Sequence, residues 1–177
     1  MNSQDVFEGL DTLMDSFIGG ESSYQEISYF INESISGRDI DILDLLHEYI
    51  EDGIKNKDGD RIEFCIALSG LLKKDKFLLN VYKQLLCEGW HSRQEDIVDI
   101  IGCYGDASAV PVLIKCFDLK YDWLALNSFY SFHRKLMWTI RNVDSRNYKE
   151  TLRSVSKKVS PKLKAELNQC IVNSMQP

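Results

Sequence analysis

Apolar residues recur along this chain at intervals of three and four positions, which is the period of an amphipathic helix. The pattern predicts helices over residues 4–18, 61–72 and 131–142, and a weaker one near 146–157. No segment shows the sustained alternation and hairpin turns of paired strands. We therefore expect an all-α chain of about nine to ten helices.

Local signals set the ends of further helices. Ser23 and Glu26 have the spacing of a capping box, in which each side chain binds a backbone amide at the helix start. Asp39 is expected to cap the next helix, because aspartate accepts the same kind of hydrogen bond. Ser160 precedes Pro161, a pair typical of a helix start. These signals predict helices joined by short turns.

The stretch from Ser92 to Phe117 gives the clearest helix pair. Ser92 and Glu95 again have capping-box spacing. Gly105 is expected to end the first helix, because glycine adopts the left-handed conformation without steric cost. Pro111 is tolerated in the first turn of the second helix. Each helix has an apolar face that only neighbours can bury, which predicts an α-solenoid.

The run from Gly105 to Leu113, Gly-Asp-Ala-Ser-Ala-Val-Pro-Val-Leu, resembles the turn of HEAT repeats. In those repeats Gly-Asp-x-x-Ala-Val precedes a Pro- or Leu-rich helix. The resemblance implies a HEAT-like α-α superhelix. We expect a single domain over residues 1–177, with an acidic helical part at 1–60 and HEAT-like pairs at 61–177.

Charge is distributed unevenly along the chain. Residues 1–60 carry fifteen acidic and three basic side chains, a net charge of −12, whereas the rest carries twelve acidic and eighteen basic ones, a net charge of +6. One interpretation is an acidic surface that attracts a basic partner. The other is a set of solvated helix faces. Either interpretation disfavours nucleic acid as the partner of the acidic part. The basic C-terminal third is expected to be a solvated face, to neutralise the acidic part, or to touch nucleic acid.

Composition indicates an ordinary water-soluble domain, with 44% hydrophobic and 27% charged residues. No apolar run is long enough to span a membrane, and the N-terminus lacks the features of a signal peptide. We therefore expect a cytoplasmic protein without membrane contacts. The five cysteines are odd in number and form no Cys-x-x-Cys pair, so buried free thiols are expected rather than disulfides or zinc ligands.

Acidic residues at short spacing form the main candidate site. Paired carboxylates can serve acid–base chemistry, but an exposed helix face is the simpler interpretation. His91 and Glu95 are four residues apart, as two metal ligands on a helix can be, yet His91 precedes the expected helix and no further ligands lie nearby. Phosphate-binding loops, dinucleotide-binding glycine motifs and nucleophile elbows do not occur. We expect no enzyme activity, cofactor or metal. The closely spaced carboxylates that form the main candidate site are Asp41, Asp44, Glu48, Glu51 and Asp52.

Large aromatic residues concentrate in the second half of the chain. Tryptophan and tyrosine are frequent hot spots of protein interfaces, although packing between helices is expected for most of them here. Trp90 and Trp123 are flanked by polar residues and are the best candidates for exposure. The cluster comprises Trp90, Tyr121, Trp123, Phe129, Tyr130, Phe132 and Trp138.

A larger pattern over residues 61–143 resembles a group of bacterial HEAT-like immunity proteins, which are encoded beside polymorphic or contact-dependent growth inhibition toxins. A second histidine often precedes the Glu-Asp pair in that group, whereas this chain has Gln94 there. This departure puts any ligand role of the pair in doubt. The matching elements are Leu85 to His91 (Leu-Leu-Cys-Glu-Gly-Trp-His), Glu95-Asp96-Ile97, Asp106 to Leu113, and Arg134-Lys135 before Trp138.

The resemblance implies a cytoplasmic antidote that binds a cognate toxin domain and blocks its active site or substrate path. Many such toxins are nucleases with basic clefts, which an acidic surface would fit. The alternative is a HEAT-like adaptor or scaffold that binds other proteins. For either function, the residues expected to contact the partner are Asp41, Asp44, Glu48, Glu51, Asp52, Trp90, His91 and Trp123.

Overall fold

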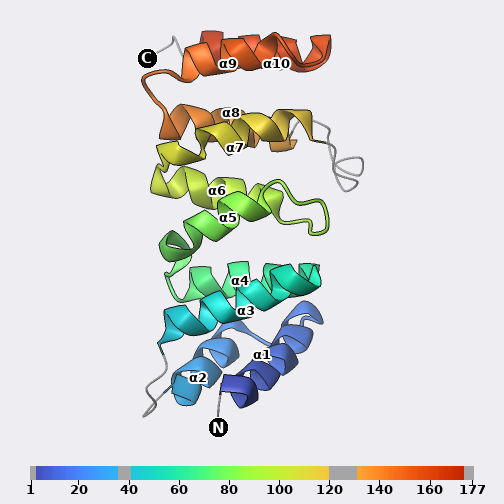
Figure 1. Cartoon of the computed structure of the whole chain (residues 1–177), viewed down its shortest axis with the longest axis vertical. Coiled ribbons are helices and arrows are strands. Elements are labelled where there is room, and N and C mark those ends of the chain that lie inside the picture. Colours follow the sequence, from blue (N-terminus) through green and yellow to red (C-terminus); the bar gives the residue numbers. More distant parts are fainter. Residues whose placement is uncertain (1–2, 36–40, 120–130, 174–177) are drawn as a thin grey trace. The chain divides into compact units, whose positions relative to one another are not determined.

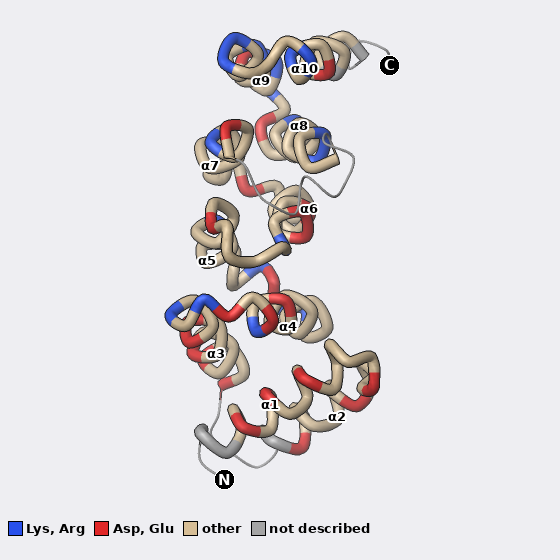
Figure 2. Tube along the Cα trace, turned by 90° about the vertical axis from the view of Figure 1, so that its right-hand side faces the viewer, with Lys and Arg blue, Asp and Glu red and all other residues tan. Residues whose placement is uncertain are grey.

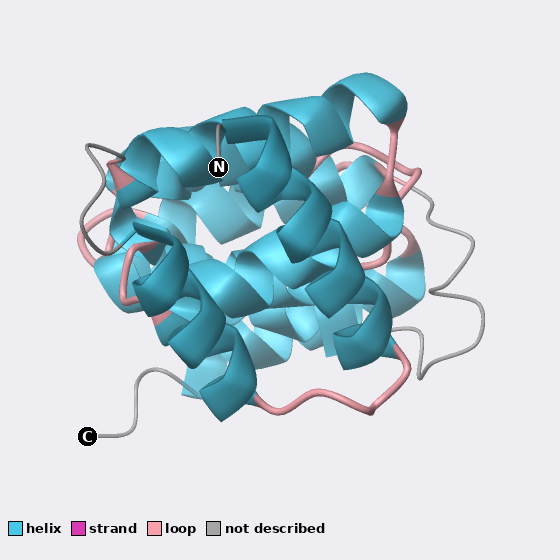
Figure 3. Cartoon of the chain, turned by 90° about the horizontal axis from the view of Figure 1, so that it is seen from below, coloured by secondary structure: helices cyan, strands magenta, loops and turns pink. Residues whose placement is uncertain are grey.

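A computed structural model of the chain describes residues 3–35, 41–119 and 131–173. Within these ranges all regular elements are helical, ten α-helices and three short 3-10 segments, and there is no strand. Figures 1 and 3 show helices joined by loops. The prediction of an all-α chain is thereby confirmed. The chain divides into two compact units, which we call unit 1 (Met1–Leu78) and unit 2 (Leu79–Pro177). This division falls later than the predicted change of character at residue 60.

The described part of unit 1 forms four α-helices and one 3-10 turn. The core is aromatic and aliphatic, and Tyr49 and Phe64 pack edge to face with ring centroids 6.3 Å apart. Both rings are completely buried. The elements are α1 (Ser3–Ile18), α2 (Tyr24–Ile35), α3 (Ile42–Asn56), α4 (Gly59–Leu71) and η1 (Asp75–Leu78).

The helix starts of unit 1 follow side-chain capping. Ser23 and Glu26 form the predicted capping box: the Ser23 amide donates to Glu26 Oε2 at 2.7 Å, and the Glu26 amide donates to Ser23 Oγ at 3.3 Å. The cap of α3 is Asp41, whose carboxylate accepts from the Leu43 amide, and not the predicted Asp39, which lies outside the described residues. Asp58 caps α4 in the same manner.

Among its described residues unit 2 has six α-helices, and consecutive helices form pairs. Figures 1 and 2 show α5 beside α6, α7 beside α8 and α9 beside α10, in layers that follow chain order. The closest packing joins α6 to α8 and α9 to α10. The elements are α5 (Leu79–Leu85), α6 (Gln94–Tyr104), η2 (Ala107–Ala109), α7 (Val110–Lys115), η3 (Cys116–Asp118), α8 (Ser131–Val143), α9 (Tyr148–Ser156) and α10 (Pro161–Asn173).

For the helix pair between Ser92 and Phe117, the predicted turn is confirmed and the predicted cap of the first helix is wrong. Gly105 ends α6 with a φ of 64°, and Pro111 lies in the first turn of α7. The predicted Ser92–Glu95 capping box does not form, because α6 begins at Gln94 and has no side-chain cap. Glu95 instead accepts a hydrogen bond from Ser131 Oγ of α8 at 2.8 Å. A contact between helices has replaced the local one.

The four cysteines whose side chains the structure describes are free thiols, but they are not uniformly buried. Cys65 and Cys116 lie in the core, whereas Cys87 is half-buried and Cys103 is exposed. The expectation of buried thiols is therefore wrong for Cys103. The side chain of Cys170 and the aromatic segment 120–130 lie outside the described residues.

Candidate partner-binding surfaces

The exposed carboxylates of α3 form one continuous stripe. Asp44, Glu48 and Glu51 are spaced by four and three residues, which places them on one side of the helix. All three are exposed. None of the three forms a hydrogen bond or ion pair with the described part of the chain. We call these three residues the α3 acidic face. Asp41 lies at its N-terminal end, where its carboxylate is engaged as the helix cap.

Asp52 differs from the other four predicted carboxylates, because it takes part in an internal ion-pair cluster. Its carboxylate pairs with the guanidinium of Arg61 on α4. Arg61 also pairs with Asp11 of α1 at 2.7 Å and lies 3.8 Å from the carboxylate of its neighbour Asp58. The Arg61 side chain is only 13% exposed. Asp52 therefore holds α3 to α4 and has little freedom to meet a partner.

Tyr49 closes this cluster from the core side. Its hydroxyl donates to Asp11 Oδ1 at 2.6 Å, and the Arg61 guanidinium lies 4.7 Å from the ring centroid. Burial, together with the hydrogen bond to Asp11, raises the pKa of the Tyr49 hydroxyl. Tyr49 consequently stays a neutral donor at any physiological pH, and one guanidinium joins α1, α3 and α4.

The charge of unit 1 reinforces the α3 acidic face. Residues 1–78 carry seventeen acidic and seven basic side chains, whereas residues 79–177 carry ten acidic and fourteen basic ones. Unit 1 therefore has a net charge of −10 and unit 2 one of +4. Figure 2 shows acidic positions on all four helices of unit 1. The field around unit 1 favours approach of a positively charged surface.

His91 occupies an internal position in the loop between α5 and α6. It is 5% exposed. Its Nδ1 lies 3.1 Å from the Arg93 amide, which donates to it, so Nε2 carries the proton and donates to the Leu85 carbonyl oxygen at 2.9 Å. Burial lowers the pKa of the imidazole. This position removes His91 from the candidate contact residues and makes it a positioning residue of the loop.

Trp90 is held on the surface of the same loop. It is half-buried, and its Nε1 donates to Glu88 Oε2 at 3.0 Å. Gln94 anchors the loop from below, since its fully buried amide nitrogen donates to the Glu88 and His91 carbonyl oxygens at 2.6 and 3.0 Å. Trp90 thus remains a contact candidate on a fixed loop. The other predicted tryptophan, Trp123, lies outside the described residues.

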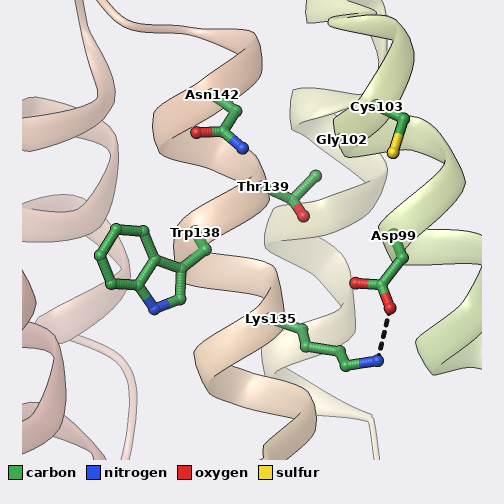
Figure 4. A pocket seen from close by; sticks show the side chains of 7 residues that line it. All are labelled: Asp99, Gly102, Cys103, Lys135, Trp138, Thr139 and Asn142. Carbon is green, nitrogen blue, oxygen red and sulfur yellow. Dashed lines mark hydrogen bonds and ion pairs between the residues drawn. The ribbon is translucent and has the colours of Figure 1, made fainter.

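A groove between α6 and α8 was missed by sequence reasoning. It encloses about 410 Å³. Its floor exists because Gly102 has no side chain: a Cβ there would lie 3.2 Å from Thr139 Oγ1. Lys135 and Asp99 form an ion pair of 2.6 Å across the groove, and Trp138 forms the α8 rim (Figure 4). The Trp138 side chain is 53% exposed.

The sequence does contain a signal for the exposure of Trp138. Arg134 and Asn142 lie four residues before and after it, on the same side of α8. A residue between two polar neighbours at helical spacing belongs to the solvent face. The buried side of α8 runs instead through Phe132, Leu136 and Ile140.

The described residues hold no group of three or more metal-ligating side chains. They also contain no helix long and apolar enough to cross a bilayer. No known protein family, curated protein or solved structure matches this chain. The resemblance to HEAT-like immunity proteins therefore stays a prediction from the sequence.

Proposed function

We propose that this chain is an immunity protein of a bacterial polymorphic or contact-dependent growth inhibition system. It binds a cognate toxin domain in the cytoplasm and blocks its active site. The α3 acidic face carries the proposal: three exposed carboxylates stand in one row without a partner among the described residues, on a unit with a net charge of −10.

The chemistry of such a face suits a basic partner. Complementary charge speeds the encounter of two proteins and orients them before close contact. A nuclease-type toxin has a basic cleft, because it must bind phosphates. A row of carboxylates can occupy that cleft in place of the nucleic acid. Inhibition then follows from occupancy, without any catalytic group on this chain.

Within this proposal the helices supply a HEAT-like scaffold. Two features of unit 2 support it, namely consecutive helices paired in layers and the Gly105 turn. Trp90 is a second contact, because its ring is fixed on a rigid loop and therefore loses little freedom on binding. The repeated helix pairs also favour the alternative function of a HEAT-like adaptor or scaffold.

The test is co-expression with the product of the neighbouring upstream gene. We expect a stable complex on size-exclusion chromatography and protection of cells from that product. Recovery of a housekeeping assembly in a pulldown, without protection, would favour the adaptor instead. Absence of both a complex and protection would refute the immunity function.

The α3 acidic face is tested by charge reversal. The triple variant Asp44→Lys, Glu48→Lys, Glu51→Lys should slow association with the toxin by at least about tenfold at low salt and flatten its salt dependence. Stopped-flow association kinetics measure both effects. A matched control reverses Glu8, Asp15 and Glu33, three exposed carboxylates elsewhere in unit 1. Equal loss in both variants would mean that net charge matters and that this face does not.

A further inference from the structure

The solvent side of α8 carries an arginine–tryptophan–arginine row in unit 2. Arg134, Trp138 and Arg141 are spaced by four and three residues and therefore share one side of the helix. The Arg141 guanidinium lies 5.1 Å from the centroid of the Trp138 ring. This cation–π contact places the guanidinium over the exposed face of the indole. Neither arginine has an ion-pair partner among the described residues.

Beside this row lies the groove between α6 and α8. The contact of Gly102 with Thr139 brings the two helices close and leaves room of about 410 Å³ above it. Thr139 cannot turn toward a ligand, because its hydroxyl donates to the Val98 carbonyl oxygen at 3.3 Å and the residue is 5% exposed. The floor of the groove is therefore fixed, and the groove has room for one or two side chains of a partner.

Charge decides which partner fits. Lys135 is fully engaged, because its ammonium pairs with Asp99 at 2.6 Å and with Glu95 at 3.3 Å. Lys135 and Asp99, the two charged residues of the groove lining, balance each other, whereas Glu95 next to them on α6 adds one negative charge. Outside the groove lining, α8 carries the positive charges of Arg134 and Arg141 on either side of Trp138 in sequence, in a unit that is positive overall. A partner segment that docks here must bring carboxylates.

We propose that the α8 row and the adjoining groove form a docking site for an acidic segment of a partner protein. One apolar side chain of that segment lies on the Gly102–Thr139 floor beside Trp138. Its carboxylates pair with Arg134 and Arg141, which are two helical turns, or about 10 Å, apart. Tryptophan and arginine are the residue types most enriched in interface hot spots. The site is independent of the α3 acidic face and of the toxin that we propose for it.

The experiment measures fluorescence anisotropy of three fluorescein-labelled probes with the full chain. The first is a peptide of about twelve residues, with a Leu-Phe pair at its centre and aspartates and glutamates on both sides. The second has lysines in place of the carboxylates, and the third is an oligothymidylate of equal length. We expect the acidic peptide to bind at least about tenfold more tightly than the lysine peptide. Tightest binding of the oligothymidylate would overturn the proposal in favour of stacking of single-stranded nucleic acid on Trp138.

Variants locate the site. Trp138→Ala, and separately Arg134→Glu with Arg141→Glu, should each weaken the acidic peptide about tenfold or more. The control is Arg153→Glu with Lys158→Glu, which removes the same charge from exposed positions near α9. All the substituted side chains reach solvent, and circular dichroism verifies that each variant is folded. If the control weakens binding as much as the arginine pair, or if Trp138→Ala binds like the native chain, the proposed site is wrong.

Discussion

The two units use carboxylates in opposite ways. In unit 2, acidic side chains of α6 and of the turn before α7 are paired with lysines from other helices, as in Lys135 with Asp99 and Lys83 with Asp106 at 2.9 Å. In unit 1, the carboxylates of Asp44, Glu48 and Glu51 face solvent and have no partner in the part of the chain that the structure describes. Acidic residues therefore mark helix packing in one unit and an available surface in the other. Composition alone does not distinguish the two roles.

The largest expected effect concerns the exception in unit 1, where carboxylates do surround a buried charge. Arg61→Met should lower the free energy of unfolding by about 3 kcal/mol, because it removes the charge-assisted contacts of Arg61 with both Asp11 and Asp52. Urea unfolding followed by circular dichroism measures the loss. Asp44→Ala, on the exposed side of α3, is the matched control and should change stability by less than about 0.5 kcal/mol. Similar losses for both variants would remove the distinction between engaged and available carboxylates.

A smaller effect is expected from the packing of unit 2. Gly102→Val adds a branched side chain where even a Cβ would lie 3.2 Å from Thr139 Oγ1. Separation of α6 from α8 should lower the free energy of unfolding by about 1–3 kcal/mol. Thermal unfolding measures it, with Gly89→Val as control, because a Cβ at Gly89 meets nothing within 4 Å. A neutral Gly102→Val would show that the helices do not need this close approach.

The smallest expected effect is a pH dependence in the loop of unit 2. The pKa of His91 is lowered below 6.5 in the folded chain, so the unfolded chain binds the proton more readily. Stability should therefore fall as pH drops below about 6.5, by at most about 1.4 kcal/mol per pH unit. His91→Asn should flatten this slope between about pH 7.5 and 5.5 in urea titrations. An unchanged slope would place the proton uptake elsewhere.

Much of the fold follows from local sequence signals. The helical period, the Ser23–Glu26 capping box and the Gly105 turn each depend on residues within a few positions of one another. The Ser92–Glu95 box failed because Glu95 has a partner thirty-six residues away, Ser131. A pattern that spans one helix turn cannot reveal that Ser131 competes with Ser92 for Glu95.

The candidate site was predictable only in part, for a similar reason. The helical period separates Asp52 from the α3 acidic face. At 100° per residue, the side chain of Asp52 leaves the helix axis about 80° away from the direction of the Asp44 side chain. The period gives no indication of Arg61, which arrives from the next helix. His91 was expected among the partner contacts, yet both ring nitrogens bind backbone groups of its own loop. Trp138 was expected to pack, although its neighbours on α8 are polar.

The Arg61 cluster also governs how the N-terminal region can move. Detaching α1 from α3 and α4 would separate Asp11 from both Arg61 and Tyr49 in a single step. Fraying of this helix one turn at a time is thus penalised at the cluster, and opening becomes cooperative. Because α3 belongs to the same locked block, its row of carboxylates keeps a constant spacing. A partner therefore meets three carboxylates whose backbone positions folding has already fixed, which lowers the entropy cost of binding.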